Sequence, residues 1–246
     1  SPAAPDLFDF AVWREENPPT DDGANFFAAM FKDGLPDNDM PGRVTRPDIL
    51  PVVNRTIRWD YPAGKTAEAA RRYAVTPYTL IMAVITMVLG KYTSSEDVVL
   101  GAAMSGRALW SCRDIIGMFA NTVVLRAKPA GRTVFSDYLA EVDTVMAGVR
   151  RYQDYPFHQL VRSLEIERVP SRHPVFDVFV NYIGAMPVLQ LNGVQARYRH
   201  LSNQRLPVDI QLEIFEEQNT LCFELSYAHE VYMPEIMENM AVQLQA

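Results

Sequence analysis

The amino-acid sequence predicts an α+β fold, a mixed α/β sandwich in which helices flank a central mixed β-sheet. Three observations lead to this prediction. Stretches with apolar residues at helical spacing alternate along the chain with short runs rich in branched aliphatic residues. One run, residues 97–104, is continuously apolar, as in a strand that is buried on both faces. Two others, residues 209–216 and 220–227, are joined at Gln218-Asn219, which predicts an antiparallel hairpin.

The helices follow from apolar spacing and from start signals. Asp6 is expected to cap a short helix with Leu7, Phe10 and Trp13 on one side, an apolar segment that suggests an internal part of a longer polypeptide. Thr76 precedes a proline at the first helical position, and the helix after it has a wide apolar face. Further helices are predicted at residues 25–32, 65–73, 77–92, 133–151, 156–164 and 234–244.

The strands follow from alternation and from continuous apolar runs. Residues 53–61 alternate between apolar and polar side chains, the period of a strand. Gly117 is expected to form a turn that leads directly into a β-branched strand ending at Arg126. The other predicted strands are residues 97–104, 176–183, 194–200, 209–216 and 220–227, and residues 33–48, rich in proline, glycine and aspartate, are predicted as a loop.

Composition excludes several classes of protein. The 246 residues are 48% hydrophobic and 22% charged, which is typical of a globular protein with a core. The net charge is −7 without a basic patch, so we expect no nucleic-acid partner. No apolar run approaches the ~18 residues of a membrane span, so we expect no membrane association. Cys112 and Cys222 match no metal-ligand spacing and predict reduced thiols in a cytoplasmic protein.

Two local patterns raise the question of chemistry. Residues 101–107 (GAAMSGR) are not a phosphate loop, because no Gly-Lys-Ser/Thr follows, and not a nucleophile elbow, because Ala103 and Arg107 occupy the positions of the required glycines. Ser105 is interpreted as the polar end of a strand. His173 and Asp177 satisfy His-x-x-x-Asp, the pattern in which acyltransferases of the chloramphenicol-acetyltransferase type use histidine as a general base. No glycine follows that aspartate, and a short pattern has a high false-positive rate.

Arg126 is the other candidate. A charge at the end of an apolar strand usually faces solvent, whereas a buried charge needs a carboxylate partner. No obvious partner lies nearby in the sequence, so the pattern alone leaves both interpretations open.

Four stretches, in order, resemble the condensation domains of nonribosomal peptide synthetases. Residues 7–13 resemble Tyr-x-Asp-(Tyr/Phe)-Ala-Val-Trp, residues 116–126 resemble Ile-Gly-x-Phe-Val-Asn-Thr-x-x-x-Arg, residues 153–157 match Gln-Asp-x-Pro-Phe, and residues 168–175 resemble Arg-Asp-x-Ser-Arg-Asn-Pro-Leu. The matching positions are Asp9, Trp13, Gly117, Phe119, Asn121, Thr122, Arg126, Gln153, Asp154, Pro156, Phe157, Ser171, Arg172 and Pro174. The sequence departs from the family pattern at Leu7, Ala120, His158, Val169, His173 and Val175.

The family also has a His-His-x-x-x-Asp-Gly motif upstream of the tryptophan motif. This chain has no adjacent histidine pair, so it resembles the C-terminal half of a condensation domain. Residues 1–16 then correspond to the crossover segment and residues 17–246 to the C-terminal subdomain. The match of His173 to His-x-x-x-Asp becomes an accident inside a different motif.

The resemblance implies a chloramphenicol-acetyltransferase-like half-domain that forms a V with an N-terminal half. Between the halves, an acceptor amine attacks a donor thioester, and both substrates arrive on the phosphopantetheine arms of carrier proteins. The implied partners are the N-terminal half, peptidyl or acyl carrier proteins and a neighbouring adenylation domain, with no cofactor or metal bound directly. Asn121 and Arg126 would lie near the tunnel, and Arg126 would pair with the aspartate of the missing histidine motif.

Three functions therefore remain open. The first is the half of an amide-forming domain, without catalytic residues of its own and inactive alone. The second is a non-catalytic module that recruits a carrier protein or a tailoring enzyme. The third is a complete small acyltransferase that uses His173. A half-domain would also expose the apolar surface that its partner covers and would tend to self-associate.

Overall fold

The computed structural model describes residues 5–18, 20–37, 39–40, 54–107, 112, 114–131, 134–166, 172–185, 189–196, 206 and 208–246. The helices are α1 (Leu7–Glu16), α2 (Asp21–Met30), α3 (Ala63–Arg72), α4 (Pro77–Thr93), α5 (Phe135–Arg151), α6 (Phe157–Ser163) and α7 (Pro234–Gln245). The strands are β1 (Asn54–Pro62), β2 (Val98–Met104), β3 (Asn121–Ala127), β4 (Val178–Ala185), β5 (Leu189–Leu191), β6 (Val194–Ala196), β7 (Ile210–Glu217) and β8 (Thr220–Ala228).

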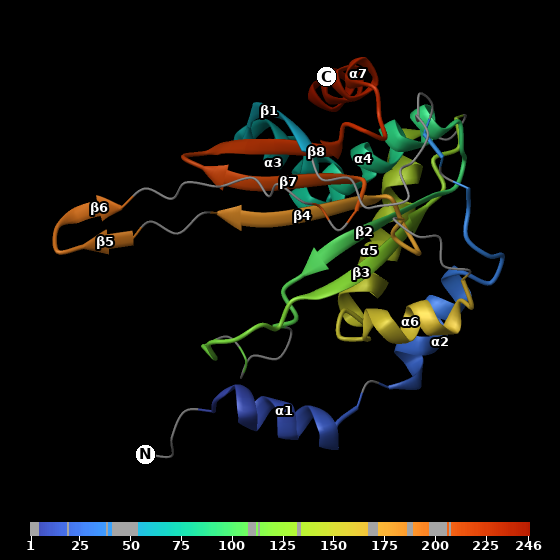
Figure 1. The fold of residues 1–246 in the computed structure, drawn as a ribbon. Helices are drawn as coiled ribbons and strands as arrows, with labels where there is room; N and C mark the ends of the chain where they lie inside the picture. Colours follow the sequence, from blue (N-terminus) through green and yellow to red (C-terminus); the bar gives the residue numbers. More distant parts are fainter. Residues whose placement is uncertain are drawn as a thin grey trace.

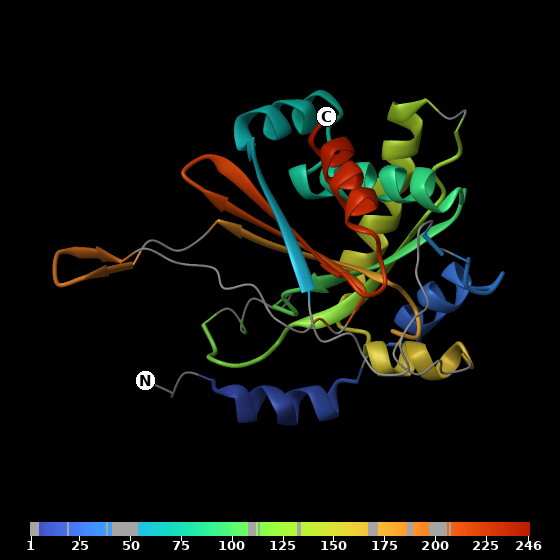
Figure 2. The ribbon, with the colours of Figure 1, turned by 45° about the horizontal axis from the view of Figure 1, so that its top comes forward.

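Six strands form one mixed sheet in the order β1-β8-β7-β4-β2-β3. The pairs β2–β4 and β4–β7 are parallel, and the others are antiparallel. Helices α3, α4, α5 and α7 cover one face, whereas α2 and α6 lie at the β3 end on the other side (Figures 1 and 2). The mixed α/β sandwich predicted from the sequence is confirmed.

The strands β2 and β3 explain the continuous apolar runs. One set of side chains, including Leu100 and Leu125, packs in the large core beneath α4 and α5. The alternate side chains, including Val99 and Val124, pack in a second cluster with residues of α2 and α6. Because β2 and β3 are buried on both faces, they show no alternation of apolar and polar residues.

Most predicted elements are present, with shifted ends. α2 begins at Asp21, four residues before the predicted start, since Thr20 is its N-cap and two aspartates occupy its first turn, where negative charge is favourable. α6 begins at Phe157 because Pro156 is its N-cap. Of the predicted strand 194–200, Val194–Ala196 pairs with β5, and the rest lies outside the described residues. The described part of the predicted loop 33–48 contains no helix or strand.

The stretch from Gly117 to Arg126 differs from the prediction. The strand begins at Asn121 rather than directly after Gly117, and it continues one residue beyond Arg126. Ile116 and Met118 are 94% and 83% exposed, so the apolar residues before the strand lie in a surface loop. Hydrophobicity alone does not distinguish a buried strand from a loop that presents apolar side chains.

Helix α1 has the predicted cap. The Asp6 carboxylate accepts hydrogen bonds from the backbone N–H groups of Phe8 and Asp9, and the Asp9 carboxylate accepts one from the N–H of Asp6. Asp9 therefore stabilises the start of the helix. None of the α1 residues is buried, and Phe8 is 75% exposed.

In the part of the chain that the structure describes, no single helix is long and apolar enough to cross a membrane. Helices α3 and α4 together have the length and apolar composition of a membrane span, but the chain bends by 92° between them.

Candidate functional site

Three of the sequence motifs meet at one place. The α1 helix lies against the loop that contains Phe119, where the rings of Phe10 and Phe119 are 4.7 Å apart between centroids. Trp13 stacks on Phe10 at 5.9 Å. The next side chain of α1, Arg14, donates to the Asp154 carboxylate at 2.8 Å and to the Asp154 carbonyl oxygen at 2.5 Å. Residues far apart in the sequence thus form one junction.

Asn121 holds the third motif in place. Its side-chain Nδ2 donates to the backbone carbonyl oxygens of Gln153 and Tyr155, at 2.9 and 2.8 Å. The Gln153 side chain donates to the carbonyl oxygen of Arg150 at 2.8 Å, which closes the end of α5. Both amide side chains are used to fix the turn between α5 and α6. Thr122, next to Asn121, pairs with Ala103 on β2 and belongs to the sheet.

The glycine of the second motif allows close approach of α1. A Cβ atom on Gly117 would lie 2.9 Å from Cδ1 of Leu7, closer than two carbon atoms can pack. Leu7, the departure from the family's tyrosine, therefore packs directly on this glycine.

Arg107 is a residue that sequence reasoning missed. Its guanidinium donates to the carbonyl oxygens of Ile115 and Gly117, at 2.8 and 3.1 Å. It also lies over the ring of Phe119, 4.3 Å from the centroid. Arg107 thus shapes the loop that carries the motif. Its position after the Ser105-Gly106 strand end was the available signal, because an arginine can hold several loop carbonyls at once.

Arg126 has its carboxylate partner within this chain. Its Nε donates to Oδ1 of Asp97 at 2.8 Å and its Nη2 to Oδ2 at 2.6 Å. Nη1 donates to the carbonyl oxygens of Met30 and Gly34, at 2.7 and 2.9 Å. The pKa of Arg126 lies above its usual value, and its hydrogen bonds to Asp97 are the largest cause. The ion pair joins neighbouring strands rather than neighbouring residues, which is why the sequence pattern left both interpretations open.

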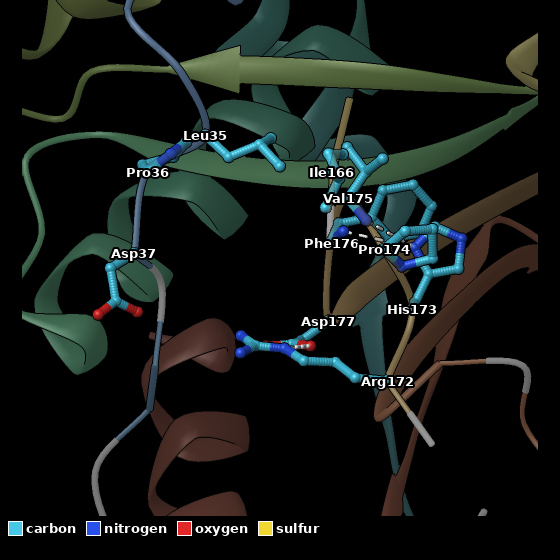
Figure 3. A pocket seen from close by; sticks show the side chains of 10 residues that line it. All are labelled: Leu35, Pro36, Asp37, Ile166, Arg172, His173, Pro174, Val175, Phe176 and Asp177. Atoms are coloured by element: carbon cyan, nitrogen blue, oxygen red, sulfur yellow. Dashed lines mark hydrogen bonds and ion pairs between the residues drawn. The ribbon is translucent and has the colours of Figure 1, made fainter. Parts of the chain in front are cut away.

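A second cluster contains the remaining motif residues (Figure 3). It lines a cavity of about 210 Å³ formed by the loop after α2, Ile166 in the segment after α6, and the segment before β4. Figure 3 shows Leu35, Pro36 and Asp37 on one side of this cavity and the segment from Arg172 to Asp177 on the other. Ser171, the remaining residue of the fourth motif, lies outside the described residues.

His173 is packed as a structural residue. Its ring stacks on Phe176, with centroids 3.9 Å apart, and on Phe157 at 5.5 Å. Its Nδ1 accepts from the backbone N–H groups of Val175 and Phe176, both at 3.4 Å. Burial lowers the pKa of His173 to about 4, partly offset by the charge of Asp177. At neutral pH the ring is uncharged, and the proton is on Nε2 because Nδ1 is the acceptor.

Asp177 does not orient that histidine. It accepts from Nε and Nη2 of Arg172 at 2.8 and 2.6 Å, and Arg172 also bonds Asp39 at 2.9 Å. Hydrogen bonding to Asp177 is the main reason why the pKa of Arg172 lies above its usual value. Pro174, between the two ends of this ion pair, lines the cavity. The His-x-x-x-Asp residues are thus engaged in separate contacts, which disfavours the interpretation of His173 as a general base.

The side chain of His173 is held by packing and by backbone contacts, and Cys112 is buried. Nδ1 of His173 is occupied by backbone N–H groups, and among the described residues no group of three or more histidine, cysteine or carboxylate residues could hold a metal ion. Cys112 and Cys222 are free thiols. Burial raises the pKa of Cys222 to about 11, which makes it a poor nucleophile at neutral pH.

Replacement of His173 with asparagine tests its packing role. The folded-state pKa of about 4 lies below the unfolded value of about 6.5, so the unfolded state binds more protons between these pH values. The stability from the neutral ring is complete above pH ~6.5 and declines as the pH falls towards 4. Between pH 7.5 and pH 5, we expect the free energy of unfolding of the wild type to fall by about 1 kcal/mol more than that of H173N, after allowance for partial solvent screening.

Urea denaturation at both pH values measures this difference. Asparagine is a matched substitution because its side-chain oxygen can accept the same backbone hydrogen bonds without titrating. Equal pH dependence in the two proteins would contradict the assignment of His173 as a buried neutral residue.

The six-stranded mixed sheet and its covering helices form a chloramphenicol-acetyltransferase-like fold, in which residues of three motifs meet at one junction and residues of the fourth line a separate cavity. The chain belongs to the condensation domain family, because the family model described as Condensation domain matches residues 2–246. Relatives include tyrocidine synthase 3 from Brevibacillus parabrevis, 29% identical over 242 residues, and bacitracin synthase 3 from Bacillus licheniformis, 30% identical over 215 residues. The alignments cover 95% and 85% of this chain but 4% and 3% of those proteins.

Solved structures share the fold. The X-domain from teicoplanin biosynthesis has a TM-score of 0.81 at 20% identity, and the match covers 99% of this chain and 59% of that one. The four-domain nonribosomal peptide synthetase AB3403 has a TM-score of 0.84 at 18% identity, with 100% of this chain and 20% of that one covered. The same X-domain in complex with OxyB matches with a TM-score of 0.76 at 22% identity, over 99% of this chain and 57% of that one.

Proposed function

We propose that this chain is the C-terminal subdomain of a peptide-bond-forming condensation domain and requires an N-terminal half for activity. In this proposal residues 1–16 are the crossover segment and residues 17–246 the subdomain. The complete domain joins a donor thioester to an acceptor amine, each presented on the phosphopantetheine arm of a carrier protein. The group that handles the proton of the amine lies in the N-terminal half, on a histidine motif that this chain lacks.

The main support is a difference in length. The chain aligns over 99% of its residues with the X-domain, yet it leaves about two fifths of that domain unmatched. Among the described residues, the one histidine at acyltransferase-like spacing has its Nδ1 engaged by backbone N–H groups. A second half that supplies both the missing length and the missing base explains the two observations together.

Exposed apolar residues also support a second half. Phe8, Ile116 and Met118 are 75%, 94% and 83% exposed, and they belong to α1 and the loop that packs against it. Monomeric proteins rarely expose clustered large apolar side chains without a binding role. We propose that this α1–loop surface contacts the N-terminal half.

The β5–β6 hairpin supports the same conclusion. It projects away from the main sheet in both views (Figures 1 and 2). Each of its strands has only three residues, and an isolated two-stranded hairpin is marginally stable in water. Contact with a neighbouring half would supply the missing packing. The exposed Val194 at its turn would then be covered.

The partners and setting follow from this proposal. The chain would work beside an adenylation domain and with carrier proteins in the cytoplasm. Asn121 acts by holding the 153–155 turn at the tunnel wall. The expected ion pair between Arg126 and the aspartate of the histidine motif is not part of this proposal, because Arg126 pairs with Asp97 within this chain.

Reconstitution tests the proposal. The 246-residue chain alone, mixed with aminoacyl donor and acceptor carriers, is expected to give no dipeptide above background. The same chain joined to an N-terminal condensation-domain half that carries the histidine motif is expected to form the amide, detected by mass spectrometry of the acceptor carrier. Alanine at the second histidine of the supplied motif is the control and should reduce amide formation by about 10²-fold or more.

Two results would count against the proposal. One is robust amide synthesis by the isolated chain. The other is a joined protein that forms no amide. The surface assignment has its own test: if Met118→Asp leaves the association of the separately expressed halves unchanged, the α1–loop surface is not part of their interface.

A second candidate is a non-catalytic module that recruits a partner protein. It is favoured by one observation: an X-domain of this fold has been solved in complex with OxyB. This alternative predicts a joined protein that forms no amide yet retains a carrier protein or a tailoring enzyme of its own pathway in a pull-down.

A further inference from the structure

The loop of residues 115–119, which presents the exposed side chains of Ile116 and Met118, has little support of its own. It contains no helix or strand, and among the described residues positions 116–119 make no backbone–backbone hydrogen bond. Its packing partner α1 has no buried residue. Ordering a loop residue costs conformational entropy, so a loop without its own hydrogen bonds needs contacts from elsewhere in the chain to hold one shape.

Arg107, just after β2, supplies such contacts. Its guanidinium donates to the backbone carbonyl oxygens of Cys112, Ile115 and Gly117, the last two at 2.8 and 3.1 Å. The same group lies 4.3 Å from the centroid of the Phe119 ring. Because a guanidinium is planar and carries five N–H donors, it can hold several carbonyl groups in a fixed arrangement. One side chain therefore connects the loop to the margin of the sheet.

Gly106 brings the two backbone segments into contact. Its φ angle is +65°, in the left-handed region that favours glycine. A Cβ atom on Gly106 would lie 1.7 Å from the carbonyl oxygen of Phe119, so no side chain fits between them. The position of the loop is thus constrained twice, by the guanidinium of Arg107 and by the close approach at Gly106.

We propose that Arg107 is a positioning residue for the interface with the N-terminal half. It holds the loop in the conformation that presents Ile116 and Met118, so this surface is formed before the two halves meet. The inference rests on the proposed function, which supplies the partner. Preorganisation strengthens binding because the ordering entropy is not lost during association. If only a fraction of the molecules holds the binding conformation, the apparent dissociation constant rises in inverse proportion to that fraction.

NMR relaxation of the isolated 246-residue chain tests the loop without its partner. Arg107→Met removes the donors and the charge and keeps an unbranched side chain. The backbone order parameters of residues 116–119 are expected to fall from about 0.85, the value of a rigid backbone, to below about 0.6. Unchanged order parameters would overturn the proposal.

Calorimetry of separately expressed halves tests the interface. The partner is an N-terminal condensation-domain half that carries the histidine motif. Arg107→Met is expected to weaken association about tenfold. Arg107→Lys should also weaken it, because one ammonium group cannot reach all three carbonyl oxygens. Gly106→Ala displaces the loop without changing a charge and should have the same effect. Arg71→Met is the matched control, because Arg71 is an exposed arginine at the end of α3, which packs on α4 and β8, and should leave association unchanged.

Covalent joining of the halves separates positioning from chemistry. A linker raises the effective concentration to the order of millimolar, so joined Arg107→Met should form amide within about twofold of the joined wild type. Loss of amide formation in that protein would contradict a positioning role. Wild-type association strength in Arg107→Met or Arg107→Lys would overturn this inference alone. Wild-type halves that do not associate, and form no amide when joined, would overturn the proposed function together with it.

Discussion

Replacement of Arg126 with alanine is expected to reduce the free energy of unfolding by about 3 kcal/mol. The Arg126 side chain is only 7% exposed, and its guanidinium satisfies both Asp97 oxygens and two carbonyl oxygens, one at the end of α2 and one in the segment after it. The variant would remove the guanidinium donors from the Asp97 carboxylate and from these carbonyls. It would also detach the end of α2 from β3. Chemical denaturation monitored by circular dichroism measures the loss.

Arg150→Ala is the matched control. Arg150 pairs with Asp143 at 3.8 Å, and both side chains are 38% exposed, so we expect its loss to change stability by less than about 1 kcal/mol. If Arg126→Ala were as stable as Arg150→Ala but lost amide formation in the joined domain, Arg126 would act in the tunnel rather than in the fold.

Replacement of Gly101 with valine is expected to reduce the free energy of unfolding about as much as Arg126→Ala does. A Cβ atom at this position of β2 would lie 2.1 Å from Cζ of Phe176, whose buried ring also stacks on His173. The ring cannot retreat, because Phe157 and Phe179 pack beside it. We expect a loss of about 3 kcal/mol, at the upper end of overpacking effects, measured by urea denaturation.

Two further variants isolate the cause. Gly131→Ala adds a methyl group where no atom lies within 4 Å, so stability should stay within about 0.5 kcal/mol of the wild type. Phe176→Leu in the Gly101→Val background should restore part of the stability, because the shorter side chain leaves room for the new Cβ. Additive losses in that double variant would mean that Gly101 is needed for another reason.

The candidate site was only partly predictable. The motifs identified most of its residues, and the structure brings Trp13, Phe119, Asn121 and Asp154 to one junction. Arg107 was overlooked because its position after Ser105-Gly106 was interpreted only as a strand end, while its contacts to loop carbonyls and to the Phe119 ring form in the tertiary structure. The pattern left the partner of Arg126 open because that partner, Asp97, lies 29 residues away in the sequence, directly before the neighbouring strand β2.

The sequence by itself determined the order of helices and strands, the hairpin at Gln218-Asn219 and the family motifs, because these depend on local periodicity and on residue identity. Only the tertiary structure decided which strands are neighbours, where the ion pairs close and which apolar residues stay in contact with solvent. Those features depend on side chains that meet across the sheet, such as Arg126 with Asp97 and Gly101 with Phe176. Ile116 and Phe176 are both strongly apolar, yet one is exposed and the other buried, because burial is set by what the rest of the chain places against each residue.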